Sequence, residues 1–246
     1  MLKHSYIVGD VCETKKAKLF WNDIHPNRKQ EIVNKISSVC QETDSSSLSF
    51  VSSAIESEDL SEEEKLSVVF EYCASPLNDG SEFFLNLFDG KLIDIDADAR
   101  STIAKIYASN VAAKFSVISH LTDQIYSDGD YTKSQILFLY AQNPSCDSSA
   151  ILSILKEKPY FGTGKYVKLG VAHRYSQNKN ADMGVFLNIF EDQKLDPSMR
   201  LEFAYIAINS KKCTKEIVKV LLEDSIEEIR KLAMNHRFGK PYGAFV

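Results

Sequence analysis

The sequence predicts an all-α protein, and three observations lead to this fold class. Apolar residues recur at spacings of three and four along most of the chain, which is the periodicity of a helix with one buried face. Glycine and proline are scarce, with 10 and 6 residues among 246, which disfavours a fold rich in tight β-turns. Helical segments also recur as pairs at intervals of 30–35 residues. A repeat of that length built from two helices predicts an α-solenoid.

The predicted helices follow one another with short polar turns between them. Ser61 and Glu64 have the spacing of a capping box, and Asp196 precedes a proline at the first position of another helix. Residues 127–130, SDGD, predict a loop. The segments predicted to be helical are 13–22, 27–39, 48–55, 61–73, 83–88, 96–110, 111–121, 135–142, 150–155, 166–175, 183–190, 199–208, 217–222 and 225–236. We therefore expect a right-handed solenoid of about six to seven helix pairs.

Three segments are expected along the chain. Residues 1–26 form an N-terminal capping segment, because the first unit of a solenoid has a neighbour on one side only. Trp21 in this segment is expected to join the core, although a stacking role is the alternative. Residues 27–238 form the repeat domain, and residues 239–246 form a C-terminal tail.

Two side-chain patterns mark the repeat. A basic residue near the start of alternate helices recurs at spacings of 35, 33, 32, 35 and 30 residues. These basic residues are Lys65, Arg100, Lys133, Lys165, Arg200 and Arg230. An alanine-x-asparagine pattern recurs at 108–110, 141–143, 207–209 and 233–235. The two patterns disagree by several residues in the last unit, so the repeats are degenerate.

The last unit resembles the HEAT repeat. Asp224, the pair Ile229-Arg230 and then Ala233 match the HEAT signature of a turn aspartate, an apolar–arginine pair and an alanine. The same stretch, IEEIRKLAMNH, also resembles the leucine-rich-repeat variant, another helical repeat. The proline common in the first HEAT helix is missing. The resemblance implies a helical array, and HEAT-like arrays serve as scaffolds, adaptors, transport receptors and, in one group, DNA glycosylases.

The acidic and basic residues of this signature are expected to connect neighbouring repeats. An aspartate can cap the second helix of a pair, while the arginine reaches toward the acidic turn of a neighbouring unit. Asp94, Arg100, Asp224 and Arg230 are therefore interpreted as structural residues rather than as ligand-binding residues.

Charge is distributed unevenly along the chain. The net charge is −5, but residues 1–98 carry 9 lysines and arginines against 19 acidic residues, whereas residues 99–246 carry 20 against 15. A protein coated by nucleic acid is therefore disfavoured, although a local basic face in the second half remains possible.

The cysteine pattern and the hydropathy favour a cytoplasmic location. The five cysteines are an odd number without CxxC spacing, which is typical of reduced thiols. No run reaches the roughly 18 apolar residues of a membrane span, and the N-terminus lacks the pattern of a secretory signal. We expect a monomer with no membrane contact.

Catalytic, metal and cofactor motifs are not recognised in the sequence. Five scattered histidines form no HExxH motif, and GxSxG does not occur. Asp94, Asp96 and Asp98 alternate as in a calcium loop, but Ala99 stands where that loop needs glycine. Residues 160–166 contain a glycine pair before a lysine without completing a Walker motif. No catalytic residue, metal or cofactor is predicted, and an enzymatic function is disfavoured but left open.

Two charged clusters are the candidate partner-binding residues. The first lies between residues 156 and 175, where basic residues alternate with aromatic ones that can stack on bases or hold an acidic protein. It comprises Lys158, Tyr160, Phe161, Lys165, Lys168 and Arg174. The second is acidic and comprises Glu58, Glu62 and Glu63. The alternative interpretation is a solvated face in both cases, with acidic residues favouring a helix N-terminus in the second.

Two functions follow as hypotheses. The first is a non-enzymatic repeat protein that binds a partner protein as an adaptor, a scaffold or an inhibitor of the immunity-protein type. The second is a nucleic-acid-binding protein similar to the HEAT-like DNA glycosylases, which need a strongly basic face.

Overall fold

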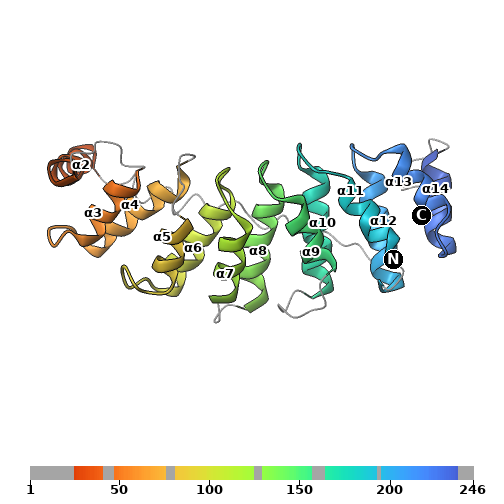
Figure 1. Cartoon of the computed structure of the whole chain (residues 1–246), viewed down its shortest axis with the longest axis horizontal. Helices are drawn as coiled ribbons and strands as arrows, with labels where there is room; N and C mark the ends of the chain where they lie inside the picture. The colour runs from red at the N-terminus through yellow and green to blue at the C-terminus, as the bar shows by residue number, and fades with distance from the viewer. Residues whose placement is uncertain are drawn as a thin grey trace. The chain divides into compact units, whose positions relative to one another are not determined.

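The protein is all-helical throughout the part of the chain that the computed structural model describes. These residues are 25–40, 47–75, 81–124, 129–156, 164–192 and 195–237. They form thirteen α-helices and no β-strand (Figure 1). The predicted all-α class is confirmed. The helix predicted at 13–22, Trp21 and the tail at 239–246 lie outside the described residues.

The chain divides into two compact units between Ala112 and Ala113, each of which is considered by itself. The helices of unit 1 are α2 (Pro26–Cys40), α3 (Leu48–Glu56), α4 (Glu62–Ala74), α5 (Ser81–Phe88) and α6 (Ala97–Ala108). Those of unit 2 are α7 (Phe115–Gln124), α8 (Gly129–Gln142), α9 (Ser148–Lys156), α10 (Lys165–Gln177), α11 (Gly184–Glu191), α12 (Pro197–Asn209), α13 (Lys215–Leu222) and α14 (Glu227–Arg237).

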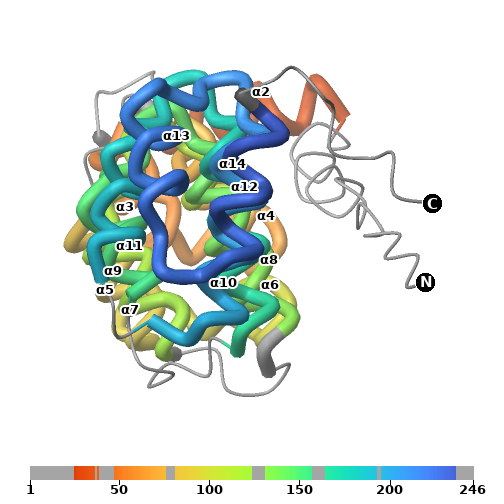
Figure 2. The backbone as a smooth tube through the Cα atoms, turned by 90° about the vertical axis from the view of Figure 1, so that its right-hand side faces the viewer, coloured from red at the N-terminus to blue at the C-terminus, as the bar shows by residue number. Residues whose placement is uncertain are grey.

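The helices of unit 2 pack in two layers. The second helix of each pair contacts the second helix of the next pair, so that α8, α10, α12 and α14 form one row. The first helices α9, α11 and α13 contact one another in the same way and form the other row. Figure 2 shows these two sets of helices on opposite sides of the unit. The apolar core lies between the two rows, where Phe186, Phe190 and Phe203 are fully buried.

Unit 1 repeats this arrangement around an aromatic core. The helices pack in the order α2 on α3, α3 on α4 and α4 on α6. Tyr72 of α4 lies edge-on against Phe83 of α5, with ring centroids 5.3 Å apart. Phe84 and Tyr107 bring α5 and α6 together at a centroid distance of 4.6 Å. Such pairs add to the stabilisation that comes from burying the rings.

Several helices begin where the sequence supplies capping residues. The capping box of Ser61 and Glu64 is formed at the start of α4, and Asp196 accepts the Met199 amide before α12. Of the two aspartates that could cap α6, Asp96 does so. The loop predicted at 127–130 differs, because α8 already begins at Gly129.

Gly170 allows α8 and α10 to approach closely, and we predict that Gly170→Ala destabilises unit 2. A Cβ atom at this position would lie 2.3 Å from the Phe138 ring on α8, well inside van der Waals contact. Overpacking costs about 1–3 kcal/mol, and the higher helix propensity of alanine offsets about 1 kcal/mol of it, so the net loss should be about 1–2 kcal/mol. Urea unfolding measures the change. Adding Phe138→Leu should recover part of the loss, and equal stability of wild type and Gly170→Ala would contradict this packing.

Candidate interaction face

A basic side chain near the start of α10, α12 and α14 binds carbonyl groups at the end of the preceding helix or in the turn that follows it. The Lys168 ammonium of α10 donates to the Leu155 carbonyl at the end of α9, at 3.4 Å. The Arg230 guanidinium of α14 donates to the Asp224 and Ser225 carbonyls that follow α13, at 2.6 and 3.0 Å. A cation at this place complements the negative end of a helix and pairs with its last carbonyl groups.

Arg200 of α12 makes the fullest set of these contacts. Its guanidinium donates to the Phe190 carbonyl and, at 2.9 Å, to the Asp192 carbonyl, both at the end of α11. Its Nε also donates to the Asp224 carboxylate of the next pair at 2.8 Å. Both side chains are buried, with Arg200 only 3% exposed. The predicted connection between neighbouring repeats is thus observed for Asp224.

The other residues interpreted as connectors between repeats behave differently. The contacts of Arg230 described above lie within its own turn, and Arg100 faces the Ile95 carbonyl of its own turn at 3.5 Å. Asp94 is exposed beside that turn. Arg100 and Arg230 therefore hold the turn before their own helix, whereas Lys168 and Arg200 fasten the two helices of one pair.

An asparagine directly after a second helix connects consecutive pairs. The Nδ2 of Asn178, after α10, donates to the Ala141 and Asn143 carbonyls at the end of α8, at 3.0 and 2.7 Å. Its Oδ1 accepts the Asn180 amide at 2.9 Å. One buried side chain therefore closes its own turn and satisfies the final carbonyl groups of the preceding second helix.

The same connection occurs elsewhere in both units. Asn110, after α6, donates to the Cys73 and Ser75 carbonyls at the end of α4, at 2.5 and 2.6 Å. The Ser210 hydroxyl, after α12, donates to the Ser176 carbonyl at the end of α10, at 2.8 Å. A serine thus replaces the asparagine in the later pair with a single donated bond.

These contacts define the register of the repeat. The polar positions 75, 110, 143, 178 and 210 each follow the basic position at 65, 100, 133, 168 or 200 by ten residues. Two details of the sequence-based alignment are therefore corrected. Lys168, not Lys165, is the repeating basic residue, because α10 begins at Lys165 and Lys168 is its fourth residue, as Arg200 is in α12. Ser210, not Asn209, occupies the asparagine position.

A tyrosine lies seven residues after four of the five basic positions, and the sequence analysis missed it; Ala207 stands at the equivalent place after Arg200. Tyr72, Tyr107, Tyr140 and Tyr175 share this position, and each is at most 1% exposed. The hydroxyl groups of the last two accept the amides of Asp147 and Asp182 at 3.0 and 2.8 Å. Burial raises the pKa of Tyr175, so this hydroxyl stays neutral at pH 7. The tyrosines pack within their own pair, as Tyr107 does on Phe84, and also contact the following pair, as Tyr72 does on Phe83.

With the register fixed, three outward positions repeat across α8, α10 and α12. They lie two residues before the basic position and five and nine residues after it. We call the nine residues at these positions the second-helix face. They are Tyr131, Phe138, Gln142, Tyr166, His173, Gln177, Ser198, Tyr205 and Asn209. None of them is buried.

The second-helix face consists of an aromatic part and a carboxamide part. Tyr166 is 75% exposed, Tyr131 62% and Tyr205 43%, all high values for aromatic side chains. The position nearest the ends of the helices carries Gln142, Gln177 and Asn209 in successive helices. The face therefore presents large apolar rings beside groups that both donate and accept hydrogen bonds.

A groove of about 570 Å³ runs between α10 and α12 on this face. Its walls include four residues of the second-helix face, namely His173, Gln177, Tyr205 and Asn209. Its far end is formed by the turns after the two helices, which contribute Lys179, Lys211 and Lys212. None of its ten lining residues, all within the described ranges, is acidic. The groove is therefore positively charged at one end.

The histidine in the groove is neutral at pH 7. Partial burial lowers the pKa of His173, and the charge of the neighbouring Arg174 lowers it further. The ring is held in place by Gln177, whose Nε2 lies 2.9 Å from His173 Nε2. The positive charge of the groove consequently comes from its lysines.

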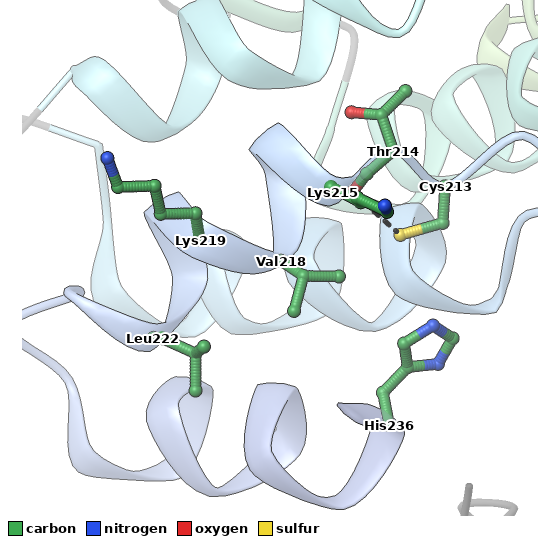
Figure 3. Close-up of a pocket in the computed structure, with 7 residues that line it drawn as sticks. All are labelled: Cys213, Thr214, Lys215, Val218, Lys219, Leu222 and His236. Carbon is green, nitrogen blue, oxygen red and sulfur yellow. Dashed lines mark hydrogen bonds between the residues drawn. The ribbon is translucent and has the colours of Figure 1, made fainter. Parts of the chain in front are cut away.

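A second hollow of about 570 Å³ lies between α13 and α14 (Figure 3). Val218 and Leu222 of α13 provide its apolar wall, and the His236 side chain points from α14 toward Cys213. Burial raises the pKa of the Cys213 thiol, which disfavours its reactive thiolate form.

The residues predicted to bind a partner are placed differently by the structure. Lys158, Tyr160 and Phe161 lie outside the described residues. Lys168 is 8% exposed and serves inside the helix pair, so it is not part of a surface. Lys165 is exposed and donates to the Ser198 hydroxyl at 2.9 Å, and Arg174 is half-buried near the groove.

The acidic cluster of unit 1 is at the surface. Glu58, Glu62 and Glu63 are exposed around the start of α4. The Glu62 carboxylate lies 3.4 Å from the Lys65 ammonium, and the neighbouring Asp59 pairs with Lys35 at 3.2 Å. Part of this charge is therefore neutralised within unit 1.

Within the described ranges, no three His, Cys, Asp or Glu side chains gather as metal ligands would. None of the helices in these ranges combines the length and the hydrophobicity needed to cross a membrane. Comparison of the chain with protein-family models, with curated proteins and with solved structures gives no match.

Proposed function

We propose that the chain is a right-handed, HEAT-like α-solenoid that acts as a monomer and binds a partner protein without catalysis, as an adaptor, a scaffold or an inhibitor. The observation that carries this proposal is the second-helix face. Aromatic and carboxamide side chains stand there at equivalent positions of successive helices, so the face can be read as one continuous surface within unit 2.

The composition of the face supports protein binding. Tyrosine is enriched among residues that dominate binding energies, because its ring offers much apolar area and its hydroxyl a hydrogen bond. Tyr166 and Tyr131 are exposed by more than half of their surface, although ring carbons in water are unfavourable. A partner that covers them would gain this apolar burial.

Repetition of the inner contacts supports the same proposal. The Arg200 and Asn178 contacts occupy buried turn positions and stabilise the packing of the pairs. Because these contacts do not involve the exposed residues of the second-helix face, such as Tyr166, those residues can be substituted while the contacts remain. The exposed residues, and with them the binding specificity, can then change while the packing of the helix pairs stays the same.

The experiment is a comparison of full-length variants in crosslinked pull-downs followed by titration of the recovered protein. The double variant Tyr166→Ala/Tyr205→Ala should weaken binding by at least about tenfold, as the loss of two interface tyrosines predicts. The matched control Asn188→Ala/Lys219→Ala changes exposed residues of α11 and α13, in the row of first helices, and should bind like wild type.

Charge reversal tests the two regions predicted from the sequence. Lys165→Glu/Arg174→Glu should also weaken binding, because both residues border the second-helix face. If only Glu58→Lys/Glu63→Lys weakens it, the interaction surface belongs to unit 1. If all variants fold and neither the tyrosine variants nor the charge-reversal variants lose binding, the second-helix face is not the binding surface.

Nucleic acid is the alternative partner, similar to that of HEAT-like DNA glycosylases. Exposed tyrosines near lysines can stack bases and hold phosphates. A duplex titration at increasing salt separates the two functions, since phosphate binding weakens steeply with salt. Tight duplex binding with a steep salt dependence would favour the alternative over a protein partner.

A further inference from the structure

The groove between α10 and α12 contains two kinds of binding group, carboxamides and lysines, which usually bind different ligands. Its sides carry the Gln177 and Asn209 carboxamides, which can bind a peptide backbone because each group donates and accepts. Its end carries lysines, which bind anions. A ligand that fits both must have peptide bonds and negative charges.

The spacing of the carboxamides restricts the shape of that ligand. Packed helices lie about 8–10 Å apart, which sets the distance between equivalent positions on α8, α10 and α12. A polyproline II chain presents the same side every third residue, after about 9 Å. Such a chain could therefore meet Gln177 and Asn209 in the groove with one backbone group in every three residues.

The charges in the groove restrict the sequence of the ligand. Lys179 and Lys211 are exposed, and Lys212 is held at the same end because its ammonium donates to the Lys179 and Ala181 carbonyls. Acidic residues are absent among the side chains lining the groove. With His173 neutral, carboxylates of a ligand would interact with the lysines alone.

We propose that this groove binds an extended acidic segment of the partner protein, with the backbone on Gln177 and Asn209 and carboxylates at Lys179 and Lys211. A nucleic acid fits less well, because three lysines neutralise few phosphates and the carboxamides face no regular partner on a sugar–phosphate chain. The proposal rests on the proposed function and specifies the chemistry of its partner.

The test uses fluorescein-labelled deca-glutamate as the probe and the full-length protein at low salt and pH 7. Fluorescence anisotropy should show saturable binding, and Lys179→Glu/Lys211→Glu should weaken it by at least about tenfold. The matched control Lys215→Glu/Lys219→Glu makes the same charge change at exposed lysines of α13 and should have a much smaller effect. Equal effects of the two double variants would overturn the proposal, since they would indicate net charge alone.

Two further probes test the role of the backbone. Deca-glutamate with alternate N-methylated peptide bonds should bind at least about fivefold more weakly than the parent peptide, since it lacks half of the N–H donors. Gln177→Ala/Asn209→Ala should abolish this difference. Equal binding of both peptides to wild type would overturn the backbone contact, and binding of oligo-dT but not of deca-glutamate would overturn the peptide ligand.

Failure of this inference is distinguishable from failure of the proposed function. If binding of the pull-down partner requires Tyr166 and Tyr205 while deca-glutamate does not bind, the second-helix face is supported as the protein-binding surface. The proposal of an acidic ligand segment is then wrong. If deca-glutamate binds as expected while binding of no partner depends on the tyrosines, the proposal for the groove is supported. The proposal that the whole second-helix face binds a protein is then wrong.

Discussion

Arg200→Ala should lower the free energy of unfolding by about 3–5 kcal/mol, the loss expected when one partner of a buried ion pair is removed. The substitution leaves the Asp224 carboxylate buried without its cation, and it also removes the donor from two carbonyl groups at the end of α11. Burying a charge without a partner is among the largest single destabilisations available to a folded chain. Urea unfolding followed by far-UV circular dichroism measures the change.

Two control variants separate the charge from the side-chain volume. Arg200→Met/Asp224→Asn removes both charges and retains much of the volume, so it should be more stable than Arg200→Ala. Lys165→Ala removes an exposed cation from the neighbouring α10 and should stay close to wild type. A loss below about 1 kcal/mol for Arg200→Ala would show that solvent reaches the Asp224 carboxylate and would contradict the buried pair.

Asn178→Ala should lower the free energy of unfolding by about 2–4 kcal/mol, because the four hydrogen bonds of its side chain, one of them to the Cys146 sulfur, are lost at a site that is only 4% exposed. Two carbonyl groups at the end of α8 lose their donor, and the Asn180 amide loses its acceptor. The change should therefore separate the pairs that contain α8 and α10. Amide hydrogen exchange in α8 should accelerate along with the fall in the urea midpoint.

The isosteric and the neighbouring variants test the reason for this loss. Asn178→Asp keeps the acceptor but places a carboxylate against two carbonyl oxygens, so it should be at least as destabilising as Asn178→Ala. Asn209→Ala is the matched control, because Asn209 fits the alanine-x-asparagine pattern but is exposed on α12. A larger effect at Asn209 than at Asn178 would mean that the register of the repeat is wrong.

The two asparagines also show where the sequence-based alignment failed. The residue two positions before Asn178 is Ser176 and not an alanine, so Asn178 does not match the alanine-x-asparagine pattern. Asn209 completes the pattern one residue before the structural position, which Ser210 fills. The pattern of lysine or arginine, then tyrosine seven residues on and asparagine ten residues on, would have found the register in the units from Arg100 to Asn178. Its tyrosine was read only as an apolar residue.

Lys168 illustrates why exposure was misjudged. A lysine between aromatic residues suggests a binding surface. The Lys168 ammonium, however, binds the Leu155 carbonyl and is covered by the helix pair. The sequence contains the lysine but not the turn geometry that brings the end of α9 beside it. Buried cations of this kind become recognisable only when the helix to which they belong is aligned with its equivalents.

The sequence by itself determined the all-helical class, the positions of most helices and several of their caps, because apolar periodicity and capping are local properties of the chain. Tertiary structure alone decided which polar residues face inward. The Arg200–Asp224 pair joins residues 24 positions apart, and Asn178 reaches carbonyl groups 35 and 37 positions away. Such distances along the chain leave no periodic trace in any one helix, so the second-helix face and its groove could be assigned only after the helices were packed.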